Sequence, residues 1–227
     1  EVLAGILGRE RVIGCVTGWG ATMHSPGKLE MTSLGDFIIG NIDNREDPRL
    51  EQVQTILDCV LPTKISTNIA GDLYAKLIIN SCITSVGALC GLYLGEMLAR
   101  KKVRRIFFKI MEEALEVAKA LDIQVEVLAG KLNYYTFLEN KGFLADIKRE
   151  LFLRVLGFKY RKLKSSTLQS LERGKKTEID YLTGFITANA EKLNVSTPVN
   201  SQVYQIVKEI EQGKRKISPE NLDQISL

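Results

Sequence analysis

The pattern of apolar and polar positions changes character near residue 67. Before that point, short apolar runs alternate with glycine and polar residues, over residues 11–22, 28–33 and 36–41. Such runs predict a small antiparallel meander of β-strands with a turn at residues 24–27. Asp47-Pro48 predicts the start of a helix. Residues 64–67 predict one more short strand.

From residue 68 onward the apolar spacing is helical. Apolar residues three or four apart run from Val103 to Leu121, which predicts one long helix with a buried face. Thr197-Pro198 predicts the start of a later helix, and Gly213 predicts its end. We therefore expect a mixed α/β piece over residues 1–67, followed by an all-helical domain over residues 68–227.

Composition and charge exclude few functions. The chain has 227 residues, of which 45% are hydrophobic and 26% charged, and its net charge is +4; these values are typical of a soluble globular protein. Basic clusters at residues 101–105, 159–164 and 214–216 are less dense than the aromatic-interleaved patches of nucleic-acid-binding proteins. No nucleic-acid partner is expected, and a small anionic ligand would be served by the same charges.

Cysteine and histidine usage argues against a metal site. The four cysteines show no paired metal-ligand spacing, and His24 is the only histidine. We therefore expect no metal, and a serine–histidine triad that uses any other histidine is excluded. His24 lies in a His-Ser-Pro-Gly sequence that is typical of a solvated turn. Unpaired thiols are typical of a reducing compartment, so the predicted location is cytoplasmic.

One uncharged segment has the length of a membrane span. Residues 77–95 contain no charged side chain, and a span of the bilayer takes about 20 apolar residues. The segment contains four polar side chains and three glycines and is closely flanked by Lys76 and Glu96. A buried helix, or a pair of short ones, in a soluble core is the better interpretation, and no membrane partner is expected.

Polar side chains interrupt this apolar helix at a regular spacing. Lys76, Asn80 and Thr84 are four residues apart, so they lie along one helical stripe. Burying a lysine without a partner is costly. Lys76 therefore either lies at the helix end with its aliphatic stem buried, or faces a lined cleft where its pKa is tuned for general-acid work. The residues alone leave both interpretations open.

A second polar cluster lies in the sequence SSTLQSLERGKKTEID, residues 165–180. Residues 166–169 predict a capping box in which Ser166 caps a helix, and Gly174 suits the left-handed position after that helix. Thr177 predicts the cap of the next helix, whose first turn contains Glu178 and favours a carboxylate. Helix capping alone explains this window, so a functional interpretation needs support from elsewhere.

In combination, these motifs resemble the ketopantoate reductases (2-dehydropantoate 2-reductases). The likeness is carried by AKLIINSCITSVGALCGLYLGEML, by SSTLQSLERGKKTEIDYLTG about ninety residues later, and then by TPVN. The opening EVLAGILGRERVIGCVTGWGATMHSPG resembles the end of that family's nucleotide-binding domain. The resemblance implies the distal part of a Rossmann-type NADP-binding domain over residues 1–67. Over residues 68–227 it implies a helical substrate domain similar to the C-terminal domain of 6-phosphogluconate dehydrogenase.

The resemblance also implies an activity, the NADPH-dependent reduction of 2-dehydropantoate to (R)-pantoate in pantothenate and coenzyme A biosynthesis. Lys76 would bind the substrate and act as the general acid that protonates the keto oxygen. Asn80 and Ser166 match substrate-binding residues, and Glu178 matches the acidic residue that reaches the cofactor. Thr84, also expected to contact the substrate, stands where the family often has a second asparagine.

Two alternative functions and the oligomeric state stay open. Because threonine offers no amide, the substrate could be another branched 2-keto acid. The chain could also be a non-catalytic helical interaction or dimerisation module that kept the fold. A homodimer is allowed, but the sequence does not determine the oligomeric state.

One motif of the family is missing from this sequence. No Gly-x-Gly-x-x-Gly lies between a strand and a helix, because Gly14, Gly18 and Gly20 fall within strand-like sequence. A Rossmann domain holds the cofactor pyrophosphate at such a turn. We therefore expect that the front of the nucleotide-binding domain lies upstream of these residues, and that the 227 residues alone are catalytically inert.

Overall fold

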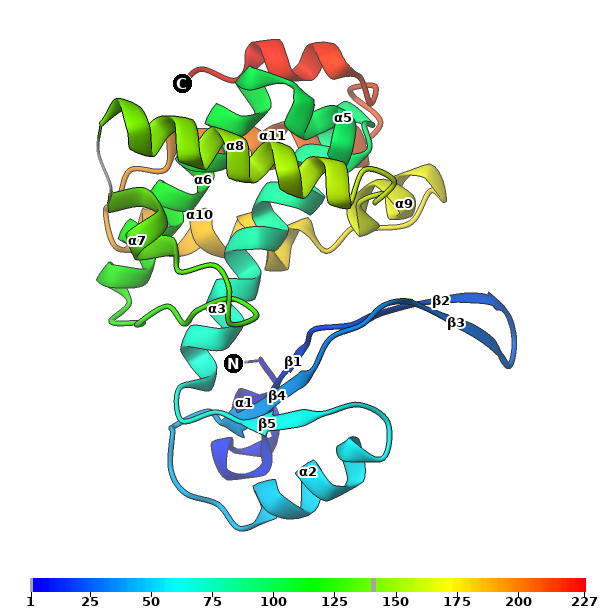
Figure 1. The fold of residues 1–227 in the computed structure, drawn as a ribbon, viewed down its shortest axis with the longest axis vertical. Helices are drawn as coiled ribbons and strands as arrows, with labels where there is room; N and C mark the ends of the chain where they lie inside the picture. Colours follow the sequence, from blue (N-terminus) through cyan, green and yellow to red (C-terminus); the bar gives the residue numbers. More distant parts are fainter. Residues whose placement is uncertain (1, 140–141) are drawn as a thin grey trace. The chain divides into compact units, whose positions relative to one another are not determined.

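The computed structural model describes residues 2–139 and 142–227, which divide into two compact units (Figure 1). All strands of the described residues belong to the first unit, and the second unit is helical. The first unit contains the residues up to Lys76 together with Ile123–Asn133, and the second contains Leu77–Asp122 together with Tyr134–Leu227. These compact units are defined by contacts within the fold. The predicted boundary between residues 67 and 68 concerns functional domains and stays a prediction.

Five strands form two separate sheets in the first unit. The larger sheet has the order β1-β4-β5, with β1 and β4 antiparallel and β4 and β5 parallel. The smaller sheet is an antiparallel pair of β2 and β3. The strands are β1 (Ile13–Thr17), β2 (Gly20–Ser25), β3 (Lys28–Ser33), β4 (Phe37–Asn41) and β5 (Thr63–Ile65).

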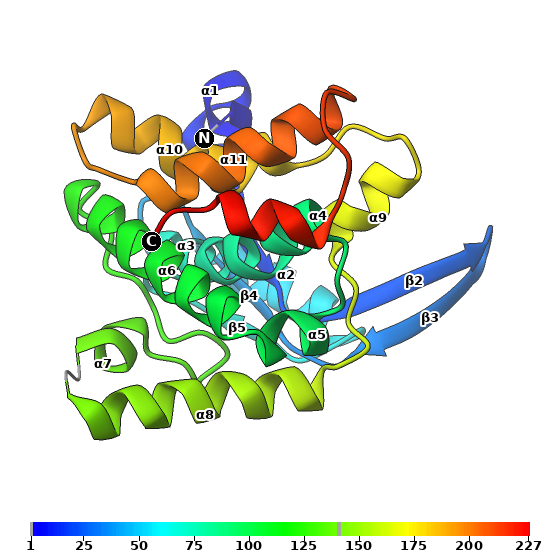
Figure 2. The ribbon, with the colours of Figure 1, turned by 90° about the horizontal axis from the view of Figure 1, so that it is seen from above.

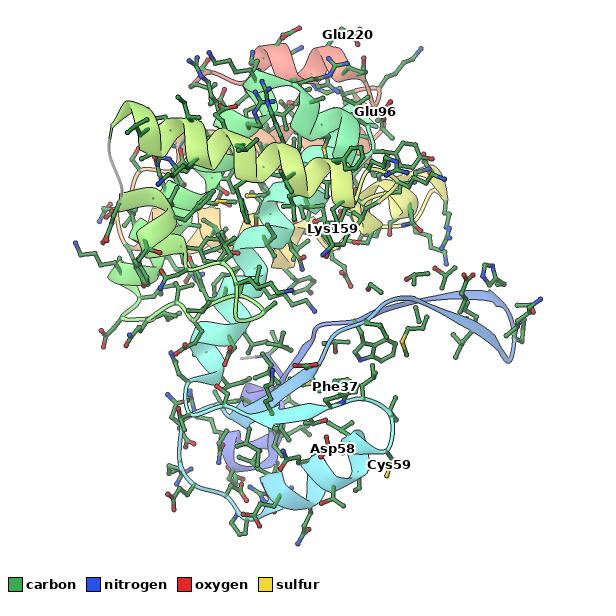
Figure 3. The ribbon with its side chains drawn as sticks, in the orientation of Figure 1. Phe37, Asp58, Cys59, Glu96, Lys159 and Glu220 are labelled. Atoms are coloured by element: carbon green, nitrogen blue, oxygen red, sulfur yellow. The ribbon has the colours of Figure 1, made fainter. Side chains whose placement is uncertain are left out.

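The predicted meander is in fact a long hairpin interrupted at one point. The apolar run over residues 11–22 divides after Thr17, because Gly18 leaves the ladder and donates its N–H to the Asp36 carbonyl at 2.9 Å. A Cβ on Gly18 would lie 2.7 Å from that same carbonyl oxygen, so only glycine fits there. Beyond the interruption, Trp19 packs edge-on against Phe37, which Figure 3 labels on β4, with ring centroids 5.7 Å apart.

The turn of this hairpin is shorter than predicted. His24 lies inside β2 rather than in the turn, and its side chain is exposed beside Glu30, with 2.7 Å between Nε2 and Oε2. Only Pro26 and Gly27 form the turn, with Gly27 at φ 78, a conformation that glycine adopts without strain.

A parallel β-α-β unit completes the first unit. The helix α2 (Arg49–Asp58) connects β4 to β5, as parallel neighbours require. Asp47 Oδ1 accepts a hydrogen bond from the backbone N–H of Arg49 at 3.0 Å, so Pro48 precedes the helix by one residue. At the other end of the unit, Gly8 at φ 92 follows the last residue of α1 (Val2–Leu7); Glu1 lies outside the described residues. A 3-10 turn, η1 (Arg9–Arg11), follows.

Helix α3 (Ile69–Asn80) begins in the first unit and ends in the second. It is followed by a π-helical turn, η2 (Ser81–Ser85), and by α4 (Val86–Cys90). The remaining helices are α5 (Leu94–Ala99), α6 (Lys101–Ala120), α7 (Tyr134–Glu139), α8 (Phe143–Lys159), α9 (Ser166–Glu172), α10 (Thr183–Lys192) and α11 (Pro198–Glu211), with 3-10 turns η3 (Ile179–Tyr181) and η4 (Pro219–Gln224).

The core of the helical unit lies between α4, α6, α10 and α11 (Figure 2). The predicted stripe on α6 is confirmed, because Val103, Ile106, Phe107 and Ile110 are fully buried. The predicted helix after Thr197-Pro198 is confirmed as α11, and Gly213 follows its end at φ 70.

The uncharged segment is a core element, as predicted. Ile69–Cys90 is a continuous helical stretch that is long and apolar enough to cross a membrane by length and composition. However, 67% of its most apolar window is buried inside the protein, and Ile78, Cys82, Val86 and Leu89 have no exposed surface. A helix buried on all sides by protein is expected to be apolar all round.

Candidate active site

Lys76 lies in the C-terminal half of α3, and its ammonium group is hydrogen-bonded to a backbone carbonyl of β1. The Asn68 side chain caps this helix, since its Oδ1 accepts from the N–H of Gly71 at 3.2 Å. Seven residues into α3, the half-buried Lys76 donates a hydrogen bond from Nζ to the carbonyl oxygen of Thr17, the last residue of β1. An ammonium group has three donors, so two remain for a ligand.

Burial makes the Lys76 ammonium group more acidic. Removing an ammonium from water disfavours its charged form, and burial accordingly lowers the pKa of Lys76, while the nearby Cys15 thiol acts in the opposite direction. A lysine with a lowered pKa is a stronger acid than an ordinary lysine. The group is therefore suited to give up a proton to an oxygen atom that gains negative charge.

The α-helical register that aligns Lys76 with Asn80 does not continue to Thr84. The π turn starts directly after Asn80 and inserts extra chain into the helix. Thr84 is buried, and its hydroxyl donates to the Asn80 carbonyl at 2.8 Å. The side-chain amide of Asn80 is half-exposed and has no hydrogen-bond partner among the described residues. Asn80 thus keeps both donor and acceptor for a ligand, whereas the donor of Thr84 is already used.

The prediction that Ser166 caps a helix is wrong by one residue. The cap of α9 is Ser165, whose buried hydroxyl accepts from the N–H of Leu168 at 3.0 Å. Gln169 donates to the Lys164 carbonyl at 3.3 Å instead of completing a capping box. Ser166 is exposed in the first turn of α9, and its hydroxyl has no bonding partner within the described part of the chain. The Ser166 hydroxyl is therefore not used for helix capping.

Glu178 is exposed, whereas the residues on either side of it, Thr177 and Ile179, are buried. Thr177 Oγ1 accepts from the N–H of Ile179 at 3.3 Å. The cap position of the 3-10 turn η3 is nevertheless Glu178 and not Thr177 as predicted, and its side chain makes no cap bond. The long helix predicted to start at Thr177 begins only at Thr183, because the backbone breaks at Leu182. Glu178 itself is exposed, and the described residues give its carboxylate no partner.

An ion-pair cluster that the sequence did not reveal fixes the stretch around Glu178. Glu211 accepts a hydrogen bond from the N–H of Thr177 at 2.6 Å, and Lys208 lies 2.7 Å from Glu211. Asp180 accepts from the hydroxyl of Tyr204 at 2.8 Å and from Lys208. Burial would raise the pKa of Asp180 and of Glu211, but these hydrogen bonds lower both below their ordinary values. The cluster therefore keeps its charges and holds the backbone on either side of Glu178.

Segments far apart in the sequence meet around the π turn of the helical unit. Ser85 and Thr183 share a hydrogen bond of 2.7 Å, which connects the π turn to the start of α10. The start of α9 packs against α4, where a Cβ on Gly87 would lie 2.9 Å from the side chain of Ser165. These segments carry four of the predicted site residues: Asn80, Thr84, Ser166 and Glu178. Lys76 is connected to them through α3, one helical turn before Asn80.

The glycines of the first unit do not form a pyrophosphate site. Gly14 lies inside β1 opposite Gly40, and Gly20 opens β2. Both strands are antiparallel to their partners through these positions, and neither leads into a helix, whereas a dinucleotide-binding turn joins a strand to a helix N-terminus. The described residues therefore contain no turn of the kind that binds a dinucleotide pyrophosphate.

Two further features of the described residues bear on ligands. No group of three His, Cys, Asp or Glu side chains is placed to hold a metal ion. A groove of about 720 Å³ lies between α6 and α8. Its lining contains none of the predicted site residues.

Solved structures of known proteins share this fold. A ketopantoate reductase of the PanE/ApbA family from Ralstonia eutropha JMP134 has a TM-score of 0.73 at 23% identity, covering 95% of this chain and 65% of its own. A structure of D-mandelate dehydrogenase with NADH has a TM-score of 0.76 at 17% identity, covering 94% and 68%. The shared fold is the end of a Rossmann-type domain leading into a helical domain, which confirms the predicted fold class.

Sequence comparison then gives the family. Residues 68–211 match the profile described as ketopantoate reductase PanE/ApbA C terminal, and the chain belongs to the ketopantoate reductase family. It is 30% identical to the 2-dehydropantoate 2-reductase of Pyrococcus abyssi, over 90% of this chain and 63% of that protein. The corresponding protein of Archaeoglobus fulgidus is 24% identical, over 89% and 62%. The chain thus spans about three fifths of the length of the curated relatives it matches.

Proposed function

We propose that the protein containing this chain is an NADPH-dependent 2-dehydropantoate 2-reductase that makes (R)-pantoate, with its helical substrate domain starting at residue 68. Family membership supports the reaction class, because the relatives in the comparison carry that name. The observation that carries the proposal is the Lys76 ammonium, half-buried and anchored by the Thr17 carbonyl one helical turn before the unoccupied amide of Asn80.

Lys76 performs the proton-transfer step in this proposal. A nicotinamide cofactor bound by the full protein would supply the hydride that reaches the carbon of the keto group. Nζ–H of Lys76 donates its proton to the keto oxygen, so that the C=O bond becomes C–H and O–H. The hydrogen bond to Thr17 fixes the ammonium while its other donors face the substrate. The neutral amine then regains a proton from water.

The other site residues bind and orient in this proposal. Asn80 has both amide donor and acceptor available, which suits a substrate that carries a hydroxyl and a keto group. Ser166 offers a free hydroxyl to the substrate carboxylate at the first turn of α9. The Glu178 carboxylate, on a backbone fixed by its neighbours, is assigned to the cofactor side, close to the reacting centre.

The experiment measures NADPH oxidation driven by 2-dehydropantoate in the longest natural protein that contains this chain. We expect Lys76→Ala to lower kcat by about 10²–10⁴, the usual contribution of a positioned general acid. Lys192→Ala is the matched control, because Lys192 is exposed at the end of α10, and it should keep full activity. Circular dichroism checks the fold of both variants, and NADPH fluorescence checks cofactor binding.

Two outcomes would contradict the proposal. Full activity of Lys76→Ala would exclude this lysine as the acid. No turnover of the wild type with bound NADPH would keep the fold and the cofactor but exclude 2-dehydropantoate as substrate. The same assay on the 227 residues alone tests the expectation that they are inert, and turnover there would contradict it.

A related 2-keto acid is the second candidate substrate, and one observation favours it. The only donor of Thr84 is bonded to the Asn80 carbonyl, so Thr84 offers a substrate an acceptor at most. A substrate that makes fewer polar contacts would suit this position. A panel of branched 2-keto acids, compared by kcat/KM, separates the two candidates.

A further inference from the structure

Helices α6 and α8 are neighbours in the helical unit, and the groove of about 720 Å³ lies between them (Figure 2). Gly157 of α8 packs so closely that a Cβ there would lie 2.8 Å from the side chain of Leu98, which shortly precedes α6. Glu150 of α8 pairs with the buried Arg104 of α6. The two helices are therefore antiparallel, and the start of α6 lies beside the C-terminal half of α8.

The groove has more basic than acidic side chains in its lining, six against three among the described residues. Each of the three acids is already paired with a base of the same groove. The pairs are Arg104 with Glu150, Lys109 with Glu112, and Arg149 with Asp146. Three cations remain that have no ion pair to any described residue. These three are Lys101, Arg105 and Arg154.

The three unpaired cations gather at one end of the groove, called here the cationic end. Lys101 lies one turn before Arg104 on α6, and Arg154 lies one turn after Glu150 on α8. Because Arg104 pairs with Glu150 and the helices are antiparallel, Lys101 and Arg154 lie at the same end. Arg105 is one turn after Lys101 on the same face of α6.

The start of α6 adds to the positive charge at this end. The first turn of the helix contains no acidic side chain, and no side chain caps its N-terminus. The N-terminal end of a helix dipole is positive, so it reinforces the three cations instead of offsetting them. A cleft lined by charges of one sign concentrates ions of the opposite sign. The cationic end is therefore suited to hold an anion.

The wall of the groove that α8 provides is apolar next to the cationic end. Leu151 lies one turn before Arg154, and Ile147 lies one turn before Leu151. Both line the groove, and they are 58% and 47% exposed. Sites for small molecules combine such apolar walls with a few convergent polar groups. The groove therefore offers an anion site and an apolar surface to one ligand.

We propose that the groove between α6 and α8 binds an organic phosphate whose carbon skeleton is apolar. The phosphate lies at the cationic end, where an arginine can bind two phosphate oxygens at once. The carbon skeleton lies along Ile147 and Leu151. Three unpaired cations match the two negative charges of a phosphate monoester better than the single charge of a carboxylate. The volume lies in the usual range of small-molecule sites, and a concave surface favours a free molecule over a membrane.

Isothermal titration calorimetry tests this proposal on the longest natural protein that contains this chain, with NADPH present to fill the proposed cofactor site. The probes are inorganic phosphate, hexyl phosphate and hexanoate. Hexyl phosphate should bind at least about tenfold tighter than the other two, because inorganic phosphate has no apolar part and hexanoate carries less negative charge. Added sodium chloride should weaken the binding, since salt screens exposed charges.

Variants assign the two parts of the groove. Arg105→Gln and Arg154→Gln should each raise the Kd for hexyl phosphate by about tenfold, through loss of a charge-assisted hydrogen bond. Lys148→Gln is the matched control, because Lys148 is exposed on α8 but does not line the groove, and its Kd should stay the same. Leu151→Ser should weaken the binding of hexyl phosphate and leave that of inorganic phosphate unchanged. Circular dichroism checks the fold of each variant.

Four results would overturn the proposal. Absence of hexyl phosphate binding at millimolar concentration would exclude the site. A Kd that neither Arg105→Gln nor Arg154→Gln changes would place the ligand elsewhere in the protein. Hexanoate that binds as tightly as hexyl phosphate would contradict the assignment to phosphates. Cosedimentation with phosphatidylcholine vesicles that contain phosphatidic acid, without binding of hexyl phosphate, would assign the cations to a membrane surface instead.

Discussion

Two helical segments of this protein carry many apolar residues but differ in how much of that apolar surface is buried. The stretch from α3 through the π turn to α4 is mostly buried and carries polar side chains among its buried residues. Helix α8 is covered on one face only and leaves large apolar side chains in water. Apolar content alone therefore does not tell which helix is buried. The informative residues are the exceptions in each segment, the buried polar groups and the exposed apolar ones.

The exceptions in the buried stretch concentrate at the π turn. Ser81 Oγ is buried without a partner in the described structure, and Ser85 bonds to Thr183 across the unit. π turns inside helices occur frequently at functional sites. On α8 the exceptions are exposed apolar side chains that form a single outer stripe: Leu144, Ile147, Leu151, Val155 and Phe158. We infer that the buried polar groups at the π turn mark a place for a ligand.

The largest effect that tests this comparison is the loss of reduction at high pH. The acid must be protonated to act, and burial lowers the pKa of Lys76. The rate should therefore be full below that pKa and fall about tenfold per pH unit above it, starting at a lower pH than an ordinary lysine would give. The pH dependence of kcat/KM in the free enzyme measures it.

A variant separates Lys76 from other groups that titrate at high pH. Lys76→Arg keeps a positive charge that does not titrate in this range, so its lower activity should lose the descending limb. A limb that persists unchanged would mean that another group causes it. A limb at the pH of an ordinary lysine would mean that Lys76 is not desolvated in the working enzyme.

The next effect contrasts the two faces of α8. Leu153→Ala should lower the free energy of unfolding by about 2–5 kcal/mol, because it leaves a cavity in the core. Leu151→Ala, on the outer stripe, should change the stability of the monomer by less than about 0.5 kcal/mol. Denaturant unfolding at low protein concentration checks both. Equal losses would show that the outer stripe is covered within the same chain.

Periodicity predicted most of the helical unit because its long helices bury a single stripe. The stripe on α6 and the limits of α11 follow from local rules of spacing, proline and glycine. The interruption at Gly18 did not follow, since it depends on contact with Asp36, eighteen residues away. Nor did the break at Leu182, which divides one predicted helix into η3 and α10.

The candidate site was predicted as residue types, but not as an arrangement. A lysine in an apolar helix was visible, yet whether it is buried depends on Thr17, which lies 59 residues earlier in the chain. The π turn was invisible because contacts such as that between Ser85 and Thr183 stabilise it. The polar residues Ser81, Thr84 and Ser85 in this apolar stretch were the only local signal.

Glu113 is a buried polar group that stabilises the fold, unlike the polar groups at the π turn. It caps α11 from α6, accepting hydrogen bonds of 2.9 Å from the backbone N–H groups of Val199 and Asn200. Glu113→Gln should cost about 1–3 kcal/mol, because an amide donor then faces donors. The neighbouring Glu112→Gln, which loses only an exposed ion pair to Lys109, should cost less than about 0.5 kcal/mol. Thermal unfolding compares the two.

The smallest effect separates capping from function in two adjacent serines. Ser165→Ala removes the cap of α9 and should lower the free energy of unfolding by about 1 kcal/mol. Ser166→Ala removes a hydroxyl that no described residue uses, so stability should stay the same while KM for the keto acid rises. The two serines are adjacent in the sequence, and in the structure the buried Ser165, which lies against Gly87, is the cap. If Ser166→Ala lost stability with an unchanged KM, the Ser166 hydroxyl would stabilise the start of α9 instead of binding substrate. The unpaired polar groups of the helical unit would then have a structural role.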